Sequence, residues 1–247
     1  MRNIKMTIRY DGSRYKGFQR LKDNDMTIQG KIEDVLSKMA NESIEIIGSG
    51  RTDMGVHAYG QVANFKTASN LSVDKMKTYL YEYLPEDIVI TSLEEVDGRF
   101  HSRYNAKSKV YLYKIYNNKF HDPFLRKYTT HIPKKLDIEL MKEASEYFIG
   151  EHDFTSFASS KSKKKSNVRT IYSINITETN GLVEIYFEGN GFLYNMVRII
   201  VGTLIKVGLG VYPPEHVKEI IEAKDRYVAG PKAPACGLTL VGIEYSE

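Results

Sequence analysis

The order in which strand and helix patterns alternate is the feature that most limits how this chain can fold. Residues 4–10 alternate apolar and polar side chains with a period of two, as a half-buried strand does. Apolar residues from Ile28 to Met39 follow at helical spacing, behind Thr27 as a candidate N-cap. The further elements expected are strands at 43–48, 60–66 and 87–96 and a helix at 73–84, after Ser72 and before Pro85. The order is βαββαβ, the split unit of ferredoxin-like folds.

The patterns in the second part of the chain predict a related order of strands and helices. A strand pattern at 110–116 precedes a helix pattern near 137–149, and Asn180-Gly181 is typical of a hairpin turn. The further elements expected are hairpin strands at 169–178 and 182–188, helices at 191–209 and 213–223, and a strand at 238–245. We therefore predict an α+β protein with two ferredoxin- or RRM-like βαββαβ halves, 1–105 and 106–247. Their mixed, mostly antiparallel sheet is expected to surround a central cleft.

The composition is that of a globular protein and disfavours several other classes. Of 247 residues, 42% are hydrophobic and 27% are charged, which is enough apolar material for a core. Cys236 is the only cysteine, so no disulfide can form within the chain, and we expect a reducing compartment. The most apolar run, 196–205, contains Arg198 and is shorter than a membrane span. The N-terminus lacks the apolar region of a signal peptide. We expect a cytoplasmic protein without membrane segments.

Cations and aromatic rings are interleaved between Arg99 and Lys135. This region holds ten Lys or Arg residues, a single acid, Asp122, and several Tyr and Phe rings. A second cluster, 161–169, has five basic residues and no acid. Such surfaces suit RNA because cations neutralise phosphates and flat rings stack on exposed bases. A solvated charged face is the alternative, at least as common for a lone run such as 161–169. Two such regions in one chain favour a nucleic-acid partner.

Glycine-rich and metal-binding motifs give no support for a nucleotide cofactor or a metal ion. In Gly48-Ser-Gly50 the third glycine of a dinucleotide fingerprint would fall at Asp53, and no Walker A sequence is present. The six histidines are scattered, without a His-Glu-x-x-His pair. Cys236 lies in an apolar context, which is typical of an unreactive thiol. We expect neither a metal nor a cofactor.

Asp53 stands in a glycine-bearing loop, 48–60, between two short apolar runs. The natural interpretation is strand, tight loop, strand, with the carboxylate presented where a rigid sheet holds it. A short acid in such a loop often only closes an Asx-turn, so a structural role stays open. Arg51 and Arg198 are the kind of partner that keeps a half-buried carboxylate ionised and nucleophilic. Arg198 stands in an apolar helix pattern, where an unpaired guanidinium is costly, so we expect an anionic partner or a purely structural pairing.

Five sequence blocks follow one another along nearly the whole chain. They are Tyr10-Asp-Gly-Ser-Arg-Tyr-Lys-Gly-Phe-Gln19, Arg51-Thr-Asp-Met-Gly-Val-His57, Phe100-His-Ser-Arg103 with Tyr111 after it, Gly150-Glu-His-Asp-Phe-Thr-Ser-Phe157, and Phe192-Leu-Tyr-Asn-Met-Val-Arg-Ile-Ile-Val-Gly202. The second block resembles R-T-D-A-G-V-H, the signature of the TruA-type tRNA pseudouridine synthase family, and the others resemble further blocks of that family. Five blocks in order exceed what chance similarity produces.

The resemblance implies the pseudouridine synthase fold and an isomerase that converts uridine to pseudouridine in tRNA, commonly at positions 38–40 of the anticodon stem-loop. Asp53 matches the nucleophile, which attacks a flipped-out uridine so that the base detaches, rotates and rejoins the ribose through C5. Tyr111 matches the tyrosine that stacks on the target base, Arg198 the residue that pairs with the catalytic carboxylate, and Arg51 an arginine that helps to extrude the nucleotide. The family implies no cofactor or metal, and a homodimer that shares tRNA between its subunits.

Two residues depart from the family's pattern, and two other functions stay open. Met54 replaces the usual alanine beside the nucleophile, and Phe18 replaces the usual tryptophan. The added bulk of Met54 is expected to alter RNA selection without abolishing the chemistry. One alternative is a non-catalytic RNA-binding protein built on two RRM-like halves. The other is a nucleoside hydrolase with a single carboxylate, which is weaker because no partner acid stands near Asp53 in the sequence.

Overall fold

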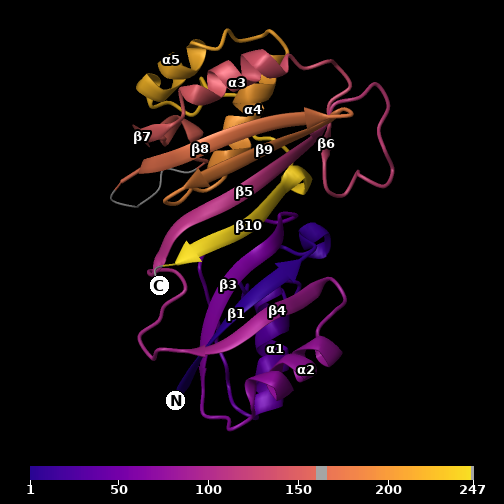
Figure 1. Ribbon diagram of the computed structural model, residues 1–247, viewed down its shortest axis with the longest axis vertical. Helices are drawn as coiled ribbons and strands as arrows, with labels where there is room; N and C mark the ends of the chain where they lie inside the picture. Colours follow the sequence, from indigo (N-terminus) through magenta and orange to yellow (C-terminus); the bar gives the residue numbers. More distant parts are fainter. Residues whose placement is uncertain (160–165, 246–247) are drawn as a thin grey trace. The chain divides into compact units, whose positions relative to one another are not determined.

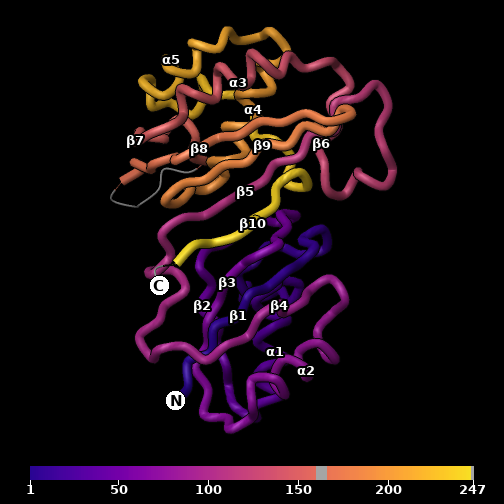
Figure 2. The backbone as a smooth tube through the Cα atoms, in the orientation of Figure 1, coloured from indigo at the N-terminus to yellow at the C-terminus, as the bar shows by residue number. Residues whose placement is uncertain are grey.

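The chain forms two compact units, drawn as a ribbon in Figure 1 and as a backbone tube in Figure 2. In this computed structural model, residues 1–159 and 166–245 are described. The first unit comprises residues 1–107 with the described part of 239–247, and the second comprises 108–238. The final strand, expected in the second half, therefore belongs with the first unit. The strand itself is confirmed with its expected bounds, and β10 (Leu238–Tyr245) pairs in parallel with β3 (His57–Thr67).

The sheet of the first unit has antiparallel strands at its centre. Its order is β4 (Ile88–Val96), β1 (Arg2–Tyr10), β3 and β10, and β1 runs antiparallel to both of its neighbours. One face of β1 is buried, with Ile4, Met6 and Ile8 fully enclosed, and the other is more exposed, which explains the alternating sequence. The helices α1 (Ile28–Ala40) and α2 (Val73–Tyr83) each bury one apolar stripe against this unit's core (Figure 1).

Both predicted helix starts in the first unit are confirmed. The Thr27 hydroxyl accepts a hydrogen bond from the Gly30 amide (3.2 Å), and the Ser72 hydroxyl accepts one from the Lys75 amide (3.4 Å). Each bond satisfies a donor that the first helical turn leaves without a partner in the helix. The helix α2 ends before Pro85, as expected, because the residue before a proline disfavours helical geometry.

The strand expected at 43–48 is wrong over most of its length, because only β2 (Ile47–Gly48) pairs with β3. The backbone just before β2 is bonded by side chains of α1 instead. The Ile46 amide donates to Glu33 Oε1 (2.9 Å), and its carbonyl oxygen accepts from Gln29 Nε2 (3.2 Å). Alternate residues here are buried, so the period of a strand arises without a sheet partner.

The sheet of the second unit consists mainly of antiparallel strands. Its order is β5 (Ala106–Tyr116), β9 (Leu182–Gly189), β8 (Val168–Thr179) and β7 (Gly150–Asp153), and the short β6 (Thr130–His131) runs parallel to β5. The hairpin between β8 and β9 is confirmed, because Asn180 and Gly181 have φ angles of 53° and 79°, as a type I′ turn requires. The sequence does not predict β6 or β7, since strands of two and four residues are too short to show a period.

The helices described in the second unit are α3 (Ile138–Glu146), α4 (Met196–Gly208) and α5 (His216–Ala223). Nearly all of α4 is buried, which explains its continuous apolar sequence. It begins at Met196 and not at 191 as expected, because Asn195 has a left-handed φ of 62°. Among the helices of the described residues, none has the length and apolar character needed to cross a membrane. The predicted α+β class is confirmed.

Candidate active site

Asp53 lies in the loop of residues 49–56 between β2 and β3, called the Asp53 loop below. Its side chain is half-buried, whereas Arg51 and Met54 are exposed, Met54 to 59%. The Val56 amide donates to the Asp53 carbonyl oxygen (3.1 Å), which closes a tight turn immediately after the acid. The predicted arrangement of strand, tight loop and strand is therefore confirmed around this carboxylate.

The beginning of the Asp53 loop is fixed to β3 by Gln61. The side-chain oxygen of Gln61 accepts from the Ser49 hydroxyl (2.7 Å), and its side-chain nitrogen donates to the Gly50 carbonyl oxygen (3.2 Å). The Ser49 amide donates in addition to the Val62 carbonyl oxygen (2.8 Å). Gln61 is fully buried, so loss of either side-chain bond would leave a buried polar group without that partner, at a cost of about 1–3 kcal/mol.

Residues 10–19, which begin at the last residue of β1, hold the Asp53 loop from the other side. The Tyr10 hydroxyl and the Thr52 hydroxyl are buried and lie 2.7 Å apart. The Phe18 amide donates to the Thr52 carbonyl oxygen (3.0 Å). Thr52 is thus bonded through both its side chain and its backbone, and these two bonds set the position of the next residue, Asp53.

Two glycines allow the 10–19 segment to approach the Asp53 loop closely. A Cβ atom on Gly12 would lie 2.0 Å from the Val56 carbonyl oxygen. A Cβ atom on Gly17 would lie 2.9 Å from the Thr52 carbonyl oxygen, and Gly17 also has a φ of 108°, which other residues rarely adopt. The first two of the five sequence blocks are therefore parts of one packed structure, in which backbone touches backbone.

Tyr15 anchors the 10–19 segment to the residue that precedes β4. Its ring is buried, its hydroxyl donates to Asp87 Oδ1 (2.6 Å), and Arg14 Nε lies 2.8 Å from Asp87 Oδ2. Burial, followed by the hydrogen bond to Asp87, raises the pKa of Tyr15 from its ordinary 10.0 to about 12. The neutral hydroxyl is therefore the form that the fold stabilises.

We expect this pKa shift to make stability fall between about pH 10 and pH 12. The folded protein holds the Tyr15 proton up to about pH 12, whereas the unfolded chain releases it near pH 10.0, so the stabilisation is complete below this window and is lost across it. Chemical denaturation of wild type and Tyr15→Phe at several pH values measures the effect. The free energy of unfolding should fall more steeply with pH in the wild type, and parallel curves would contradict this assignment.

Tyr111 lies in β5 of the second unit, on the face of the strand that carries the core. It stands opposite Phe187 of β9, which is fully buried. The Tyr111 ring meets the Phe192 ring edge to face, with the two centroids 5.3 Å apart and the planes at 86°. This contact fixes the orientation of the Tyr111 ring while the side chain stays half-buried.

Arg198 extends from the first turn of α4 and is only 8% exposed. Its Nε donates to the Ala233 carbonyl oxygen (2.7 Å), and its Nη1 donates to Asn195 Oδ1 (3.1 Å). The Ala233 amide donates back to the Arg198 carbonyl oxygen (3.0 Å). Asn195 is held in turn, because its Nδ2 donates to Ser159 Oγ (2.9 Å). Neighbours within the second unit therefore fix the direction of the guanidinium group.

The predicted site residues are divided between the two units. Asp53 and Arg51 share one loop of the first unit, and Tyr111 and Arg198 belong to the second. The bonds of Arg198 described above go to neutral oxygens, so its pairing with an anionic group stays a prediction. Sequence patterns alone do not indicate that Phe192 supports Tyr111, although Phe192 opens one of the five blocks.

The described residues contain no group of three His, Cys, Asp or Glu side chains placed to hold a metal ion. The Cys236 thiol is half-buried and donates to the Thr129 carbonyl oxygen (3.4 Å). Of the second basic cluster, 161–169, residues 161–165 lie outside the described part of the chain.

Comparison with known proteins finds relatives along the whole chain. A family model described as tRNA pseudouridine synthase matches residues 6–105 and 144–246. A tRNA pseudouridine synthase A of Bacillus sp. (strain KSM-64) is 59% identical over 245 residues, which cover 99% of this chain and 100% of that protein. A tRNA pseudouridine synthase A 2 of Bacillus cereus (strain ZK / E33L) is 55% identical and a tRNA pseudouridine synthase A 1 of Clostridium tetani (strain Massachusetts / E88) is 52% identical, with the same coverage. Asp53 and Arg198 lie in the matched segments, and Tyr111 lies between them.

Proposed function

We infer that this chain, which belongs to the tRNA pseudouridine synthase family, isomerises uridine to pseudouridine in tRNA. The protein is an enzyme of the isomerase class, because pseudouridine contains the same atoms as uridine. The family predicted from the five sequence blocks is confirmed. The roles of individual residues and the target uridines are our proposal.

In the proposed reaction the Asp53 carboxylate acts as the nucleophile on the target nucleoside. The bond between ribose C1′ and base N1 breaks, the detached base rotates, and a new bond forms between C1′ and C5. C5 gives up its hydrogen as a proton and N1 gains one, so atoms and electrons balance. Asp53 is released as a carboxylate at the end, and the exchange of bonds within one nucleoside requires no oxidant, reductant or activated donor.

The observation that carries this proposal is the fixed position of the Asp53 backbone. Thr52, the residue before it, is bonded to Tyr10 through its side chain and to Phe18 through its carbonyl group. A nucleophile has to be held near its attack geometry, since a displacement of about 1 Å costs roughly 100-fold in rate. An acid that only closes an Asx-turn requires none of these supports, so they favour a chemical role for Asp53.

The other site residues are assigned to handling the nucleotide. Tyr111 stacks on the target base and removes the proton from C5, and the edge contact with Phe192 holds its ring for that task. Arg198 supplies a cation of fixed direction that pairs with the Asp53 carboxylate and keeps it ionised. Arg51 is exposed in the Asp53 loop and contacts the RNA as the uridine is extruded. Extrusion is required because a stacked uridine is out of reach of a side chain.

The proposed target is the anticodon stem-loop, at positions 38–40, and the proposed working form is a homodimer in the cytoplasm. The resemblance of the five blocks supports the target and the dimer, and the single cysteine agrees with a reducing compartment. Light scattering after size-exclusion chromatography measures the dimer directly, with an expected mass of twice 28.3 kDa. A mass of 28.3 kDa at every concentration would exclude it.

Incubation with an unmodified tRNA transcript tests the activity. Pseudouridine is mapped by carbodiimide adducts, and free uracil is measured in the same samples. We expect pseudouridine in the anticodon stem-loop and no free uracil. Release of uracil without pseudouridine would instead indicate a nucleoside hydrolase, and binding without any product would indicate a non-catalytic RNA-binding protein.

A further inference from the structure

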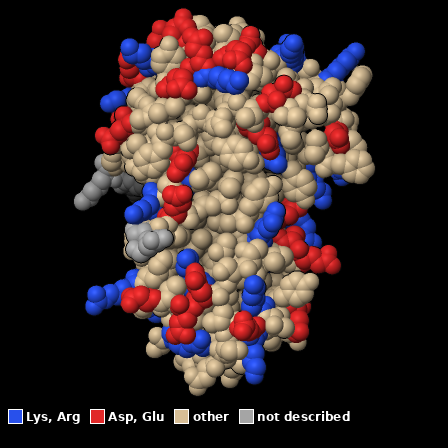
Figure 3. Space-filling view, viewed as in Figure 1, with Lys and Arg blue, Asp and Glu red and all other residues tan. Residues whose placement is uncertain are grey.

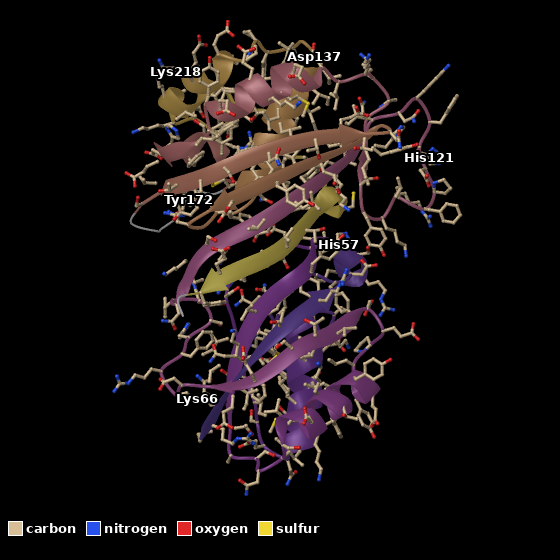
Figure 4. All side chains as sticks on the ribbon, in the orientation of Figure 1. His57, Lys66, His121, Asp137, Tyr172 and Lys218 are labelled. Carbon is tan, nitrogen blue, oxygen red and sulfur yellow. The ribbon has the colours of Figure 1, made fainter. Side chains whose placement is uncertain are left out.

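The loop of residues 117–129, which connects β5 to β6, presents two phenylalanine rings to solvent. Phe120 is 73% exposed and Phe124 is 88% exposed. Figure 1 shows this loop extending past the ends of β8 and β9, and Figure 4 shows His121 on it, away from the sheet of the second unit. A phenylalanine side chain has no polar atom, so two exposed rings on one short loop favour a ligand that covers them.

Side-chain hydrogen bonds of Asn117 and Asp122 hold the 117–129 loop in shape. Asn117 Nδ2 donates to the carbonyl oxygens of Ile132 (2.8 Å) and Lys134 (2.7 Å), which fixes the start of the loop. Asp122 Oδ1 accepts from the Phe124 amide (2.7 Å), which fixes the turn that carries the second ring. Rings on an ordered loop lose little conformational entropy on binding, so most of the stacking energy is available for affinity.

Positive charge lies beside both rings. The Lys119 ammonium group is 5.4 Å from the centroid of the Phe120 ring, and Arg126 belongs to the same turn as Phe124. The one acid in the sequence of this loop, Asp122, is engaged in the turn. A nucleotide combines a flat base with a negative phosphate, so it can stack on a ring and meet the neighbouring cation at the same time.

We propose that residues 119–126 form a platform on which unpaired nucleotides of tRNA stack, one on Phe120 and one on Phe124. This rests on the proposed function, because tRNA is the ligand, and adds a binding site separate in sequence from Asp53, Tyr111 and Arg198. The nucleotides are unpaired ones, since bases inside a helix are stacked on each other and their faces are covered.

Charge favours RNA over a second copy of this chain as the occupant. A two-fold dimer across the platform brings the same patch of both subunits together, so the cations Lys119 and Arg126 of one copy would lie near those of the other. Elsewhere on the second unit, Figure 3 shows many Asp and Glu side chains, with some Lys and Arg between them, over α3 and α5. The platform combines exposed aromatic rings with neighbouring cations, and it therefore suits a polyanion.

Equilibrium binding of unmodified tRNA measures what the rings contribute. A stack of one base on one aromatic ring is strong enough that its removal weakens binding by roughly 5-fold or more. We expect Phe120→Ala and Phe124→Ala each to raise Kd at least about 5-fold, and the double variant to raise it further. Phe124→Tyr keeps the ring and should keep the wild-type Kd. Lys119→Ala should lower the slope of log Kd against log salt concentration by about one.

Tyr81→Ala is the matched control, because Tyr81 is an exposed ring (79%) on α2 of the first unit, outside the platform. Its Kd should equal that of the wild type. An unchanged Kd in the double variant would overturn the platform. A double variant whose mass by light scattering is lower than that of the wild type would also overturn it, because the rings would then join two copies of the chain and not bind RNA. Binding that depends on the rings, in a wild type that forms no pseudouridine, would support the platform and refute the proposed function.

Discussion

Asp53→Asn is expected to lower the rate of pseudouridine formation by at least about 10⁴-fold. Asparagine has nearly the same shape as aspartate, but its amide is uncharged and a far weaker nucleophile. The Asp53 loop should keep its conformation, because the bonds of Thr52 to Tyr10 and Phe18 and those of Gln61 to the loop remain. Single-turnover assays with excess enzyme on unmodified tRNA measure the chemical step, and the Kd for tRNA is expected to stay within about 3-fold of wild type.

Met54→Ala is the matched control for Asp53→Asn. Met54 is the next residue of the loop and is 59% exposed, so its truncation leaves no cavity in the core. We expect the single-turnover rate of Met54→Ala to stay within about 10-fold of wild type, with a change in which uridines are modified. If Met54→Ala were as damaging as Asp53→Asn, the shape of the loop and not the carboxylate would determine the rate.

We expect Gly202→Ala to lower the free energy of unfolding by roughly 3 kcal/mol. A Cβ atom on Gly202, in the middle of α4, would lie 1.6 Å from the Pro231 carbonyl oxygen. That oxygen belongs to a backbone segment held against α4, since the Gly230 amide donates to Thr203 Oγ1 (3.0 Å). Either the helix or the segment has to move, and in both cases the hydrogen bond that orients Arg198 on the Ala233 carbonyl oxygen is disturbed. Urea denaturation measures the stability, and activity should fall by more than the folded fraction does.

Gly208→Ala in the same helix is the control, because it separates the clash with Pro231 from the general effect of replacing a helical glycine by alanine. A Cβ atom there would lie 2.7 Å from Met141 Sδ and 2.9 Å from Met141 Cγ, so it meets an unbranched side chain, which adapts more easily than backbone does. Alanine also has a higher helix propensity than glycine. We expect Gly208→Ala to stay within about 1 kcal/mol of the wild type. Equal losses in the two variants would mean that the contact with Pro231 is not the cause.

The long elements of the fold can be predicted from the sequence because their patterns repeat several times and end at recognisable caps. β1 alternates from Ile4 to Tyr10, and α1 begins at its Thr27 cap. Prediction fails for residues 43–46, because burial against α1 produces the period of a strand. The strand at 238–245 is predicted correctly, but its pairing with β3 is not, because a pairing that joins Thr239 to His57 leaves no local signal in the chain.

The candidate site is predictable only in part, for a similar reason. A motif predicts Asp53 as a site residue, but a glycine in a sequence does not reveal which backbone approaches it, so the contact between Gly12 and Val56 becomes visible only in the fold. The support of Tyr111 by Phe192 likewise joins residues far apart in the chain. The pairing of Arg198 with a carboxylate stays a prediction.

The central claim is that this protein isomerises uridines in tRNA and that Asp53 is the nucleophile. Its most direct test is a pseudouridine map of RNA from cells that lack this protein, before and after wild type or Asp53→Asn is returned. We predict that sites in the anticodon stem-loop of tRNA are lost without the protein, return with the wild type and stay absent with Asp53→Asn. Restoration of those sites to the wild-type level by Asp53→Asn would contradict the claim.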